Sequence, residues 1–139
     1  MSVSATFQCG ACVKVAATVT LVDPGAPDPR LTPEPPGVPP GAGTLFSSMF
    51  PDRAQLSIAG GPLSVTHGFV ETERVALALR SGDADALFRI DSEYAPFWCP
   101  TCERAYCRDH FQSWPTFDEG FYDATYGTCT AGHRRKLDD

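Results

Sequence analysis

The residues of this chain that are best suited to chemistry are its six cysteines and three histidines. Eight of them form four closely spaced pairs, which are Cys9 and Cys12, Cys99 and Cys102, Cys107 and His110, and Cys129 and His133. Each pair has two or three residues between its members, so both side chains can bind one ion. Thiolate and imidazole are the usual zinc ligands, and a structural site takes four of them. The sequence therefore predicts two zinc ions, with no ligand from the four pairs left over.

An even number of cysteines is also compatible with disulfide bonds. The N-terminus has no basic start followed by an apolar run, so we expect no secretory signal and a cytoplasmic, reducing location. No apolar run approaches the roughly 20 residues of a membrane helix. In a reducing compartment paired cysteines more often bind metal. The spacing of Cys9 and Cys12 is also that of thiol oxidoreductases, so a zinc-dependent thiol redox protein is an alternative hypothesis.

The four pairs can share two ions in two ways. In a sequential arrangement, one ion binds Cys99, Cys102, Cys107 and His110, within the segment FWCPTCERAYCRDH, and the outer two pairs bind the other. In an interleaved arrangement, the first and third pairs bind one ion, and the second and fourth pairs bind the other.

Two ligand pairs separated by four residues, with another pair before and another after them, resemble the binuclear treble-clef zinc fingers, such as RING, FYVE and PHD-type domains. The resemblance covers residues 9–12 and 97–134 and implies the interleaved, cross-braced arrangement. It also implies a protein partner, which for a RING domain is a ubiquitin-conjugating enzyme. In RING domains that enzyme contacts an apolar residue, often Trp, before the last ligand pair, and a basic residue follows the last ligand. Trp114 and Arg134 occupy these places.

Two features depart from the RING pattern. Ala11 precedes the second ligand, where RING domains usually have a larger aliphatic residue at the partner surface. The last pair, Cys129 and His133, has one more intervening residue than the usual C-x2-C. These departures affect the expected ligase activity and leave zinc binding untouched.

The ligand pairs divide the chain into three parts. We expect an N-terminal zinc knuckle at residues 1–12, a β-rich module at residues 13–95 and a zinc-binding domain at residues 96–139. Within the module, residues 23–44 hold eight prolines and four glycines, which predicts a long surface loop. The expected fold class is α+β, with a RING-like C-terminal domain whose aromatic residues form a small core around the metals.

Apolar periodicity predicts the elements of the β-rich module. Gly82 fits a helix end and Asp83 an N-cap. His67 is in phase with the apolar positions of a strand and is expected to be a core or edge histidine. The expected elements are strands at 13–22 and 45–50, a hairpin within 53–69, and helices at 72–81 and 84–90.

The net charge of −6, with only eleven Lys and Arg residues, argues against a nucleic-acid partner. The basic run at residues 134–136 is expected to be a solvated tail, and the carboxylates of FDEGFYD (residues 117–123) to lie in a solvated loop. With both zinc sites filled by protein ligands, no catalytic position is evident. The leading hypothesis is a zinc-stabilised protein–protein interaction module. In its more specific form, this module is a RING-like ligase component or an adaptor in a bacterial conjugation-type system. A structural subunit of a larger complex is a further alternative.

Overall fold

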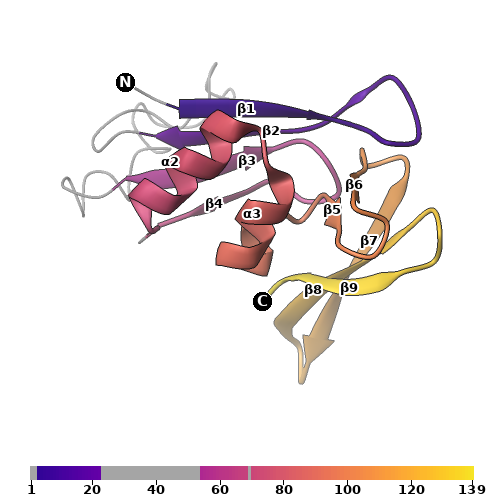
Figure 1. Cartoon of the computed structure of the whole chain (residues 1–139). Coiled ribbons are helices and arrows are strands. Elements are labelled where there is room, and N and C mark those ends of the chain that lie inside the picture. The colour runs from indigo at the N-terminus through magenta and orange to yellow at the C-terminus, as the bar shows by residue number, and fades with distance from the viewer. Residues whose placement is uncertain (1–2, 23–53, 69) are drawn as a thin grey trace, which may run out of the picture.

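The first part of the chain forms a four-stranded antiparallel sheet whose strands lie side by side in chain order (Figure 1). The computed structural model describes residues 3–22, 54–68 and 70–139. The strand expected at 13–22 and the hairpin expected within 53–69 are confirmed, whereas the first strand was not predicted. The predicted Pro-rich loop and the strand at 45–50 lie outside the described residues. The strands are β1 (Val3–Gln8), β2 (Val15–Val22), β3 (Gln55–Ala59) and β4 (Val65–His67).

Two short helices follow the sheet, where the sequence places them. Helix α2 (Thr72–Ser81) ends at Gly82, whose φ of 64° is left-handed and suits a residue without a Cβ atom. Helix α3 (Ala84–Ile90) begins after Asp83, whose carboxylate accepts a hydrogen bond of 3.0 Å from the amide of Ala86. The first helix packs across β1 and β2. Neither α-helix in the described part of the chain is long and apolar enough to span a membrane.

The rest of the chain consists of strands and turns. After a 3-10 helix, η3 (Ser92–Tyr94), a two-stranded ladder pairs β5 (Trp98–Cys99) with β6 (Arg104–Ala105). A three-stranded antiparallel sheet then combines β7 (Phe111–Asp118), β8 (Phe121–Cys129) and β9 (Arg134–Asp138). The basic run at 134–136 belongs to β9 and is not a tail, although Arg134 and Lys136 are exposed as expected and only Arg135 is half-buried. The segment 117–123 is the end of the β7–β8 hairpin, whose turn consists of Glu119 and Gly120.

The expected α+β fold class with a treble-clef C-terminal domain is wrong. Among the described residues 46% are in strands and 19% in helices, so the fold is mainly β. No helix occurs between residues 95 and 139, where the treble clef was expected. The ligand pairs lie in turns and at strand ends, with Cys99 the last residue of β5 and Cys129 the last of β8. The resemblance of the ligand spacing to treble-clef fingers led to the error. The aromatic residues expected in a small core around the metals lie in part on the sheet formed by β7 and β8.

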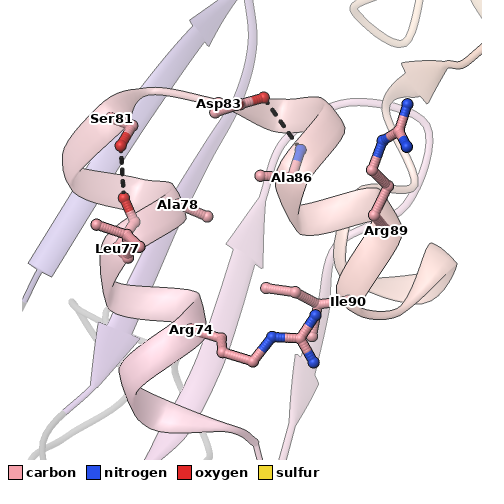
Figure 2. Close-up of a pocket in the computed structure, with 8 residues that line it drawn as sticks. All are labelled: Arg74, Leu77, Ala78, Ser81, Asp83, Ala86, Arg89 and Ile90. Carbon is pink, nitrogen blue, oxygen red and sulfur yellow. Dashed lines mark hydrogen bonds between the residues drawn. The ribbon is translucent and has the colours of Figure 1, made fainter.

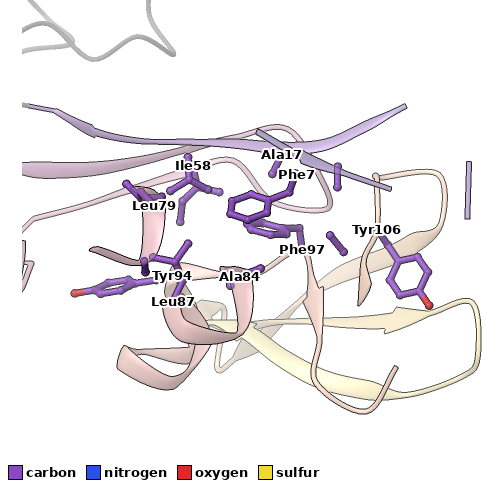
Figure 3. Packing of buried hydrophobic residues seen from close by; sticks show 14 of the residues in the cluster. Phe7, Ala17, Ile58, Leu79, Ala84, Leu87, Tyr94, Phe97 and Tyr106 are labelled. Atoms are coloured by element: carbon purple, nitrogen blue, oxygen red, sulfur yellow. The ribbon is translucent and has the colours of Figure 1, made fainter. Parts of the chain in front are cut away.

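One hydrophobic cluster runs from the four-stranded sheet to the C-terminal strands. Phe7 of β1 stacks on Phe97, with ring centroids 5.0 Å apart, and both side chains are buried (Figure 3). Further along the chain, the ring of Tyr106 meets that of Phe111 edge-on at 6.2 Å. The division at residues 12 and 95 stays a prediction, and the parts that it separates share this cluster.

Candidate metal centres

The first candidate centre brings together Cys9, Cys12, Cys107 and His110, whose ligand atoms all lie within 4.8 Å of one another. The Sγ atoms of Cys12 and Cys107 are 3.6 Å apart. The Nδ1 atom of His110 lies 3.3 Å from the Sγ atom of Cys107 and 3.7 Å from that of Cys9.

The second candidate centre contains Cys99, Cys102, Cys129 and His133, again within 4.8 Å. The Sγ atoms of Cys102 and Cys129 are 3.8 Å apart. The Nδ1 atom of His133 lies 3.6 Å from the Sγ atom of Cys99, 3.3 Å from that of Cys102 and 3.4 Å from that of Cys129. Both centres therefore offer three sulfur atoms and one Nδ1 atom.

These separations fit a tetrahedral zinc ion. With Zn–S bonds of about 2.3 Å and Zn–N bonds of about 2.0–2.1 Å, the ligand atoms of a tetrahedral site lie about 3.5–3.8 Å apart. The distances between ligand atoms in the two centres, from 3.3 to 3.8 Å, fall at or slightly below these values. The donor sets are complete without a further ligand. Both centres therefore have the shape and the chemistry of closed structural sites.

The grouping is the interleaved one. The first and third pairs form one centre, and the second and fourth pairs form the other. The sequential grouping, which would place Cys99, Cys102, Cys107 and His110 together, is not the arrangement of the structure. Each centre thus ties an early turn of the chain to a later one.

Turns between strands hold the ligands in place. Cys9 and Cys12 lie in the connection from β1 to β2, where the amide of Ala11 donates to the Sγ atom of Cys9 and that of Lys14 to the Sγ atom of Cys12, both at 3.4 Å. The amide of Gly10 donates to the carbonyl of Ala105 at 2.7 Å, which docks this turn on β6.

The other pairs use the same kind of support. The amide of Cys102 donates to the Sγ atom of Cys99 at 3.4 Å within the β5–β6 turn. Cys129 and His133 close the turn from β8 to β9, where the amide of Cys129 donates to the carbonyl of His133 at 3.2 Å. An amide that donates to sulfur stabilises the thiolate, which is the form that binds a metal.

The thiols differ in acidity for local reasons. Burial raises the pKa of Cys9, but hydrogen bonds from the amides of Cys107 and Ala11 outweigh it and lower the pKa to about 6. Cys129 has the same balance, with amide bonds from His133 and Ala131, and a pKa of about 7. Burial dominates at Cys99 and raises its pKa to about 11. Each centre therefore contains a cysteine that ionises near neutral pH, and a bound dication would favour the thiolate form of its ligands.

Two of the three residues expected at a partner surface come together. Arg134 places its guanidinium 4.8 Å from the ring centroid of Tyr126 and 5.5 Å from that of Trp114. These two rings stack at 6.4 Å and face each other across the β7–β8 register. We call Trp114, Tyr126 and Arg134 the aromatic–arginine surface. Ala11 lies elsewhere, in the turn of the first centre. Tyr126 was not predicted, because only the strand register reveals it as the neighbour of Trp114.

The sequence analysis also missed Arg135, which follows Arg134 but points to the opposite side of β9. Its guanidinium donates to the carbonyls of Ser92 at 2.7 Å, Ala95 at 2.7 Å and Trp98 at 2.8 Å. It also lies 5.0 Å from the ring centroid of Phe88. Burial lowers the pKa of Arg135 to about 10, so it stays cationic at neutral pH. Arg135 thus joins β9 to the segment that leads into the second centre.

The ninth cysteine or histidine side chain, His67, has a structural role. Its Nε2 atom is 3.1 Å from the carbonyl oxygen of Glu93, and its ring lies 5.3 Å from that of Tyr94. This agrees with the expected edge histidine.

Comparisons with known proteins add a family. A family model with the description "Domain of unknown function (DUF8328)" matches residues 1–139. No curated protein and no solved structure matches the chain.

Proposed function

We propose that this chain, which belongs to the DUF8328 family, is a zinc-stabilised protein-interaction module. The observation that carries the proposal is the pair of closed Cys3His sets. Such a site has no position for a substrate or an activated water, so its metal would support folding and not chemistry. The module would then act through its surface.

Zinc is the metal that this donor set favours. Three thiolates and one imidazole are soft to borderline ligands, and tetrahedral sites of this composition are characteristic of zinc in proteins. Magnesium and calcium prefer oxygen ligands in six or more positions and do not suit it. Binding of each ion would contribute on the order of 10–16 kcal/mol of apparent free energy, which becomes folding free energy.

The aromatic–arginine surface is the proposed contact for a protein partner. Trp, Tyr and Arg are the residue types most enriched among the energetically dominant residues of interfaces. Here all three lie on one side of the β7–β9 sheet, held by cation–π contacts. The RING-specific partner, a ubiquitin-conjugating-like enzyme, rested on the treble-clef resemblance. The mainly β fold offers that resemblance no support, so the proposal names a protein partner without a ligase role.

Two measurements test the proposal. Metal analysis of freshly purified protein should give two zinc ions per chain, and a free-thiol assay should find few reactive cysteines. The rival thiol redox protein would instead lose zinc readily and form an intramolecular disulfide under mild oxidation.

Affinity purification tests the partner surface. Wild type should retain a protein that the Trp114→Ser/Arg134→Ser variant loses, while both keep two metals. Leu77→Ser is a matched control, because Leu77 is 66% exposed on α2, outside the surface. Retention of every partner by the double variant would contradict the assignment of this surface.

A further inference from the structure

The end of the β7–β8 hairpin carries exposed aromatic side chains. We call residues 117–123 the hairpin tip. Phe117 is 65% exposed, Phe121 78% and Tyr122 48%. The rings of Phe117 and Tyr122 meet edge-on at 6.4 Å, as expected for cross-strand neighbours. In Figure 1 the end of this hairpin projects beyond the rest of the C-terminal sheet. Apolar rings at a projecting turn need a partner to leave water.

The hairpin tip is also acidic. Within the described part of the chain, the carboxylates of Asp118 and Glu119 form neither a hydrogen bond nor an ion pair. Asp123 accepts one long hydrogen bond, of 3.5 Å, from the hydroxyl of Thr116. Among the described residues no cation pairs with these three carboxylates, and they are interspersed in the sequence with the exposed rings. A partner that covers the tip must bring positive charge close to apolar surface.

The backbone of the turn adds an independent observation. Glu119 has a φ of 49° and Gly120 a φ of 85°, so both residues of this two-residue turn are left-handed. Such turns strongly favour Asn or Asp before Gly, whereas Glu is strained there. Glu119 therefore has a backbone conformation that costs stability, and such conformations are typical of residues that serve a function.

We propose that the hairpin tip docks on a basic amphipathic segment of the partner protein, in which Lys or Arg residues flank an apolar stripe. This inference rests on the proposed function and names the chemistry of the partner. Phe117 shares one face of the hairpin with Tyr122, and Phe121 lies opposite Asp118 on the other face. The segment would therefore cover the end of the hairpin, where its apolar stripe meets both Phe117 and Phe121 and its cations pair with Asp118 and Glu119. The hydroxyl of Tyr122 is already bound to Thr125 at 2.7 Å, which fixes its ring for contact.

Charge argues against two other occupants. A membrane surface and a nucleic acid are both anionic, and the tip would bring its carboxylates towards them within a chain of net charge −6.

A second copy of this chain is also a poor fit. A groove of about 350 Å³ between α2 and α3 has an apolar floor and two arginines (Figure 2). However, Arg74 is paired with Glu71 at 2.7 Å, and Arg89 with Asp85 at 2.6 Å. Asp83 also lines the groove. The groove therefore offers no net positive charge to an acidic hairpin tip.

The probe for the test is a synthetic helical peptide of roughly 14 residues with a leucine face flanked by lysines. Titration into the zinc-loaded full chain, followed by fluorescence anisotropy, should show saturable binding that weakens with salt. The Phe117→Ser/Phe121→Ser variant should bind about tenfold or more weakly, because it removes the two most exposed rings without a change in charge. Asp118→Asn/Glu119→Gln should reduce both affinity and salt dependence. Val13→Ser is the matched control, because Val13 is 96% exposed at the β1–β2 turn, and its affinity should stay within about twofold of wild type.

Several outcomes would overturn the inference. Equal peptide binding by wild type and the serine double variant would do so. Tip-dependent binding to vesicles of anionic lipid, or tip-dependent self-association in light scattering, would assign the tip to another occupant. Metal content and circular dichroism check that each variant is folded. The Trp114→Ser/Arg134→Ser variant should bind the peptide like wild type. A loss of its native partner therefore reports on the proposed function and not on the tip.

Discussion

The Sγ atom of Cys12 lies 3.6 Å from the Sγ atom of Cys107, although 95 residues separate the two cysteines in the chain. An ion bound between them would close a loop that contains most of the fold. Closing a long loop removes much of the freedom of the unfolded chain. Each candidate centre would therefore join two ligands that are close in the sequence and also cross-link two distant segments of the chain.

Double variants distinguish ligands of one centre from ligands of different centres. Cys12→Ser/Cys107→Ser damages only the first centre and should leave one tightly bound zinc. Cys12→Ser/Cys129→Ser damages both and should leave little zinc. Native mass spectrometry measures the difference. The sequential arrangement predicts the reverse result, because Cys12 and Cys129 would then share one ion and Cys107 would belong to the other.

Replacement of Arg135 should destabilise the protein strongly. Arg135→Met removes the guanidinium that donates to the carbonyls of Ser92, Ala95 and Trp98. We expect a loss of about 2–4 kcal/mol in the free energy of unfolding, measured by denaturant titration of the zinc-loaded protein. Arg89→Met is the control, because Arg89 is exposed and forms only a surface ion pair, and it should cost less than about 1 kcal/mol. Similar losses in the two variants would contradict the role of Arg135.

Glu93 should make stability depend on pH. Burial, and then the neighbouring Asp138, raise its pKa from 4.5 to about 7. Between these values the native state holds a proton that the unfolded state has released, so the free energy of unfolding falls as pH rises. Above pH 7 Glu93 is ionised in both states, and the free energy of unfolding is lowered by the full cost of holding its carboxylate in the native structure.

Glu93→Gln removes this cost and still accepts the hydrogen bond from the amide of Asp139. It should stabilise the protein by about 1–2 kcal/mol at pH 8, after allowance for solvent screening, with no gain near pH 4.5. Denaturant titrations of wild type and variant across this pH range measure the difference in their free energies of unfolding. Acid affects the metal ligands equally in both proteins, so that effect cancels in the difference. A difference independent of pH would disprove the assignment.

Gly127 allows the C-terminal sheet to pack. A Cβ atom at this position would lie 2.5 Å from Cε1 of Phe111 and 2.8 Å from Cδ1 of Leu137, and both side chains are buried. Gly127→Ala should therefore destabilise the protein by about 1–3 kcal/mol in thermal or denaturant unfolding. Gly10→Ala is the comparison, because the atom nearest to its Cβ would be Cδ of the Arg104 side chain at 2.9 Å, which can move more easily than a buried ring, and it should cost less.

Local signals in the sequence predicted the helices and the ligand pairs. Gly82 and Asp83 mark a helix end and a helix start by backbone preferences that need no tertiary context. The spacing of Cys107 and His110 identifies a chelating pair in the same way. The interleaved grouping came from the resemblance to cross-braced fingers, and it holds although the fold class implied by that resemblance does not.

The features that were missed depend on contacts between distant segments. Arg135 is buried because carbonyls about 40 residues earlier surround it, and no local pattern distinguishes it from Arg134. Phe117 and Phe121 were expected in a core because aromatic residues are usually buried. Only the position of the hairpin shows that they are exposed.

The interleaved centres also set the time at which the protein can bind its metals during synthesis. Cys9 and Cys12 leave the ribosome long before Cys107, and at roughly 5–20 residues per second a gap of 95 residues corresponds to about 5–20 seconds. The second centre waits for His133 in the same way. Neither ion can be fully coordinated on a growing chain that stops short of these residues. A ribosome that stalls before residue 107 would therefore release a product with neither centre complete, whose unfolded segments expose apolar surface to chaperones and proteases.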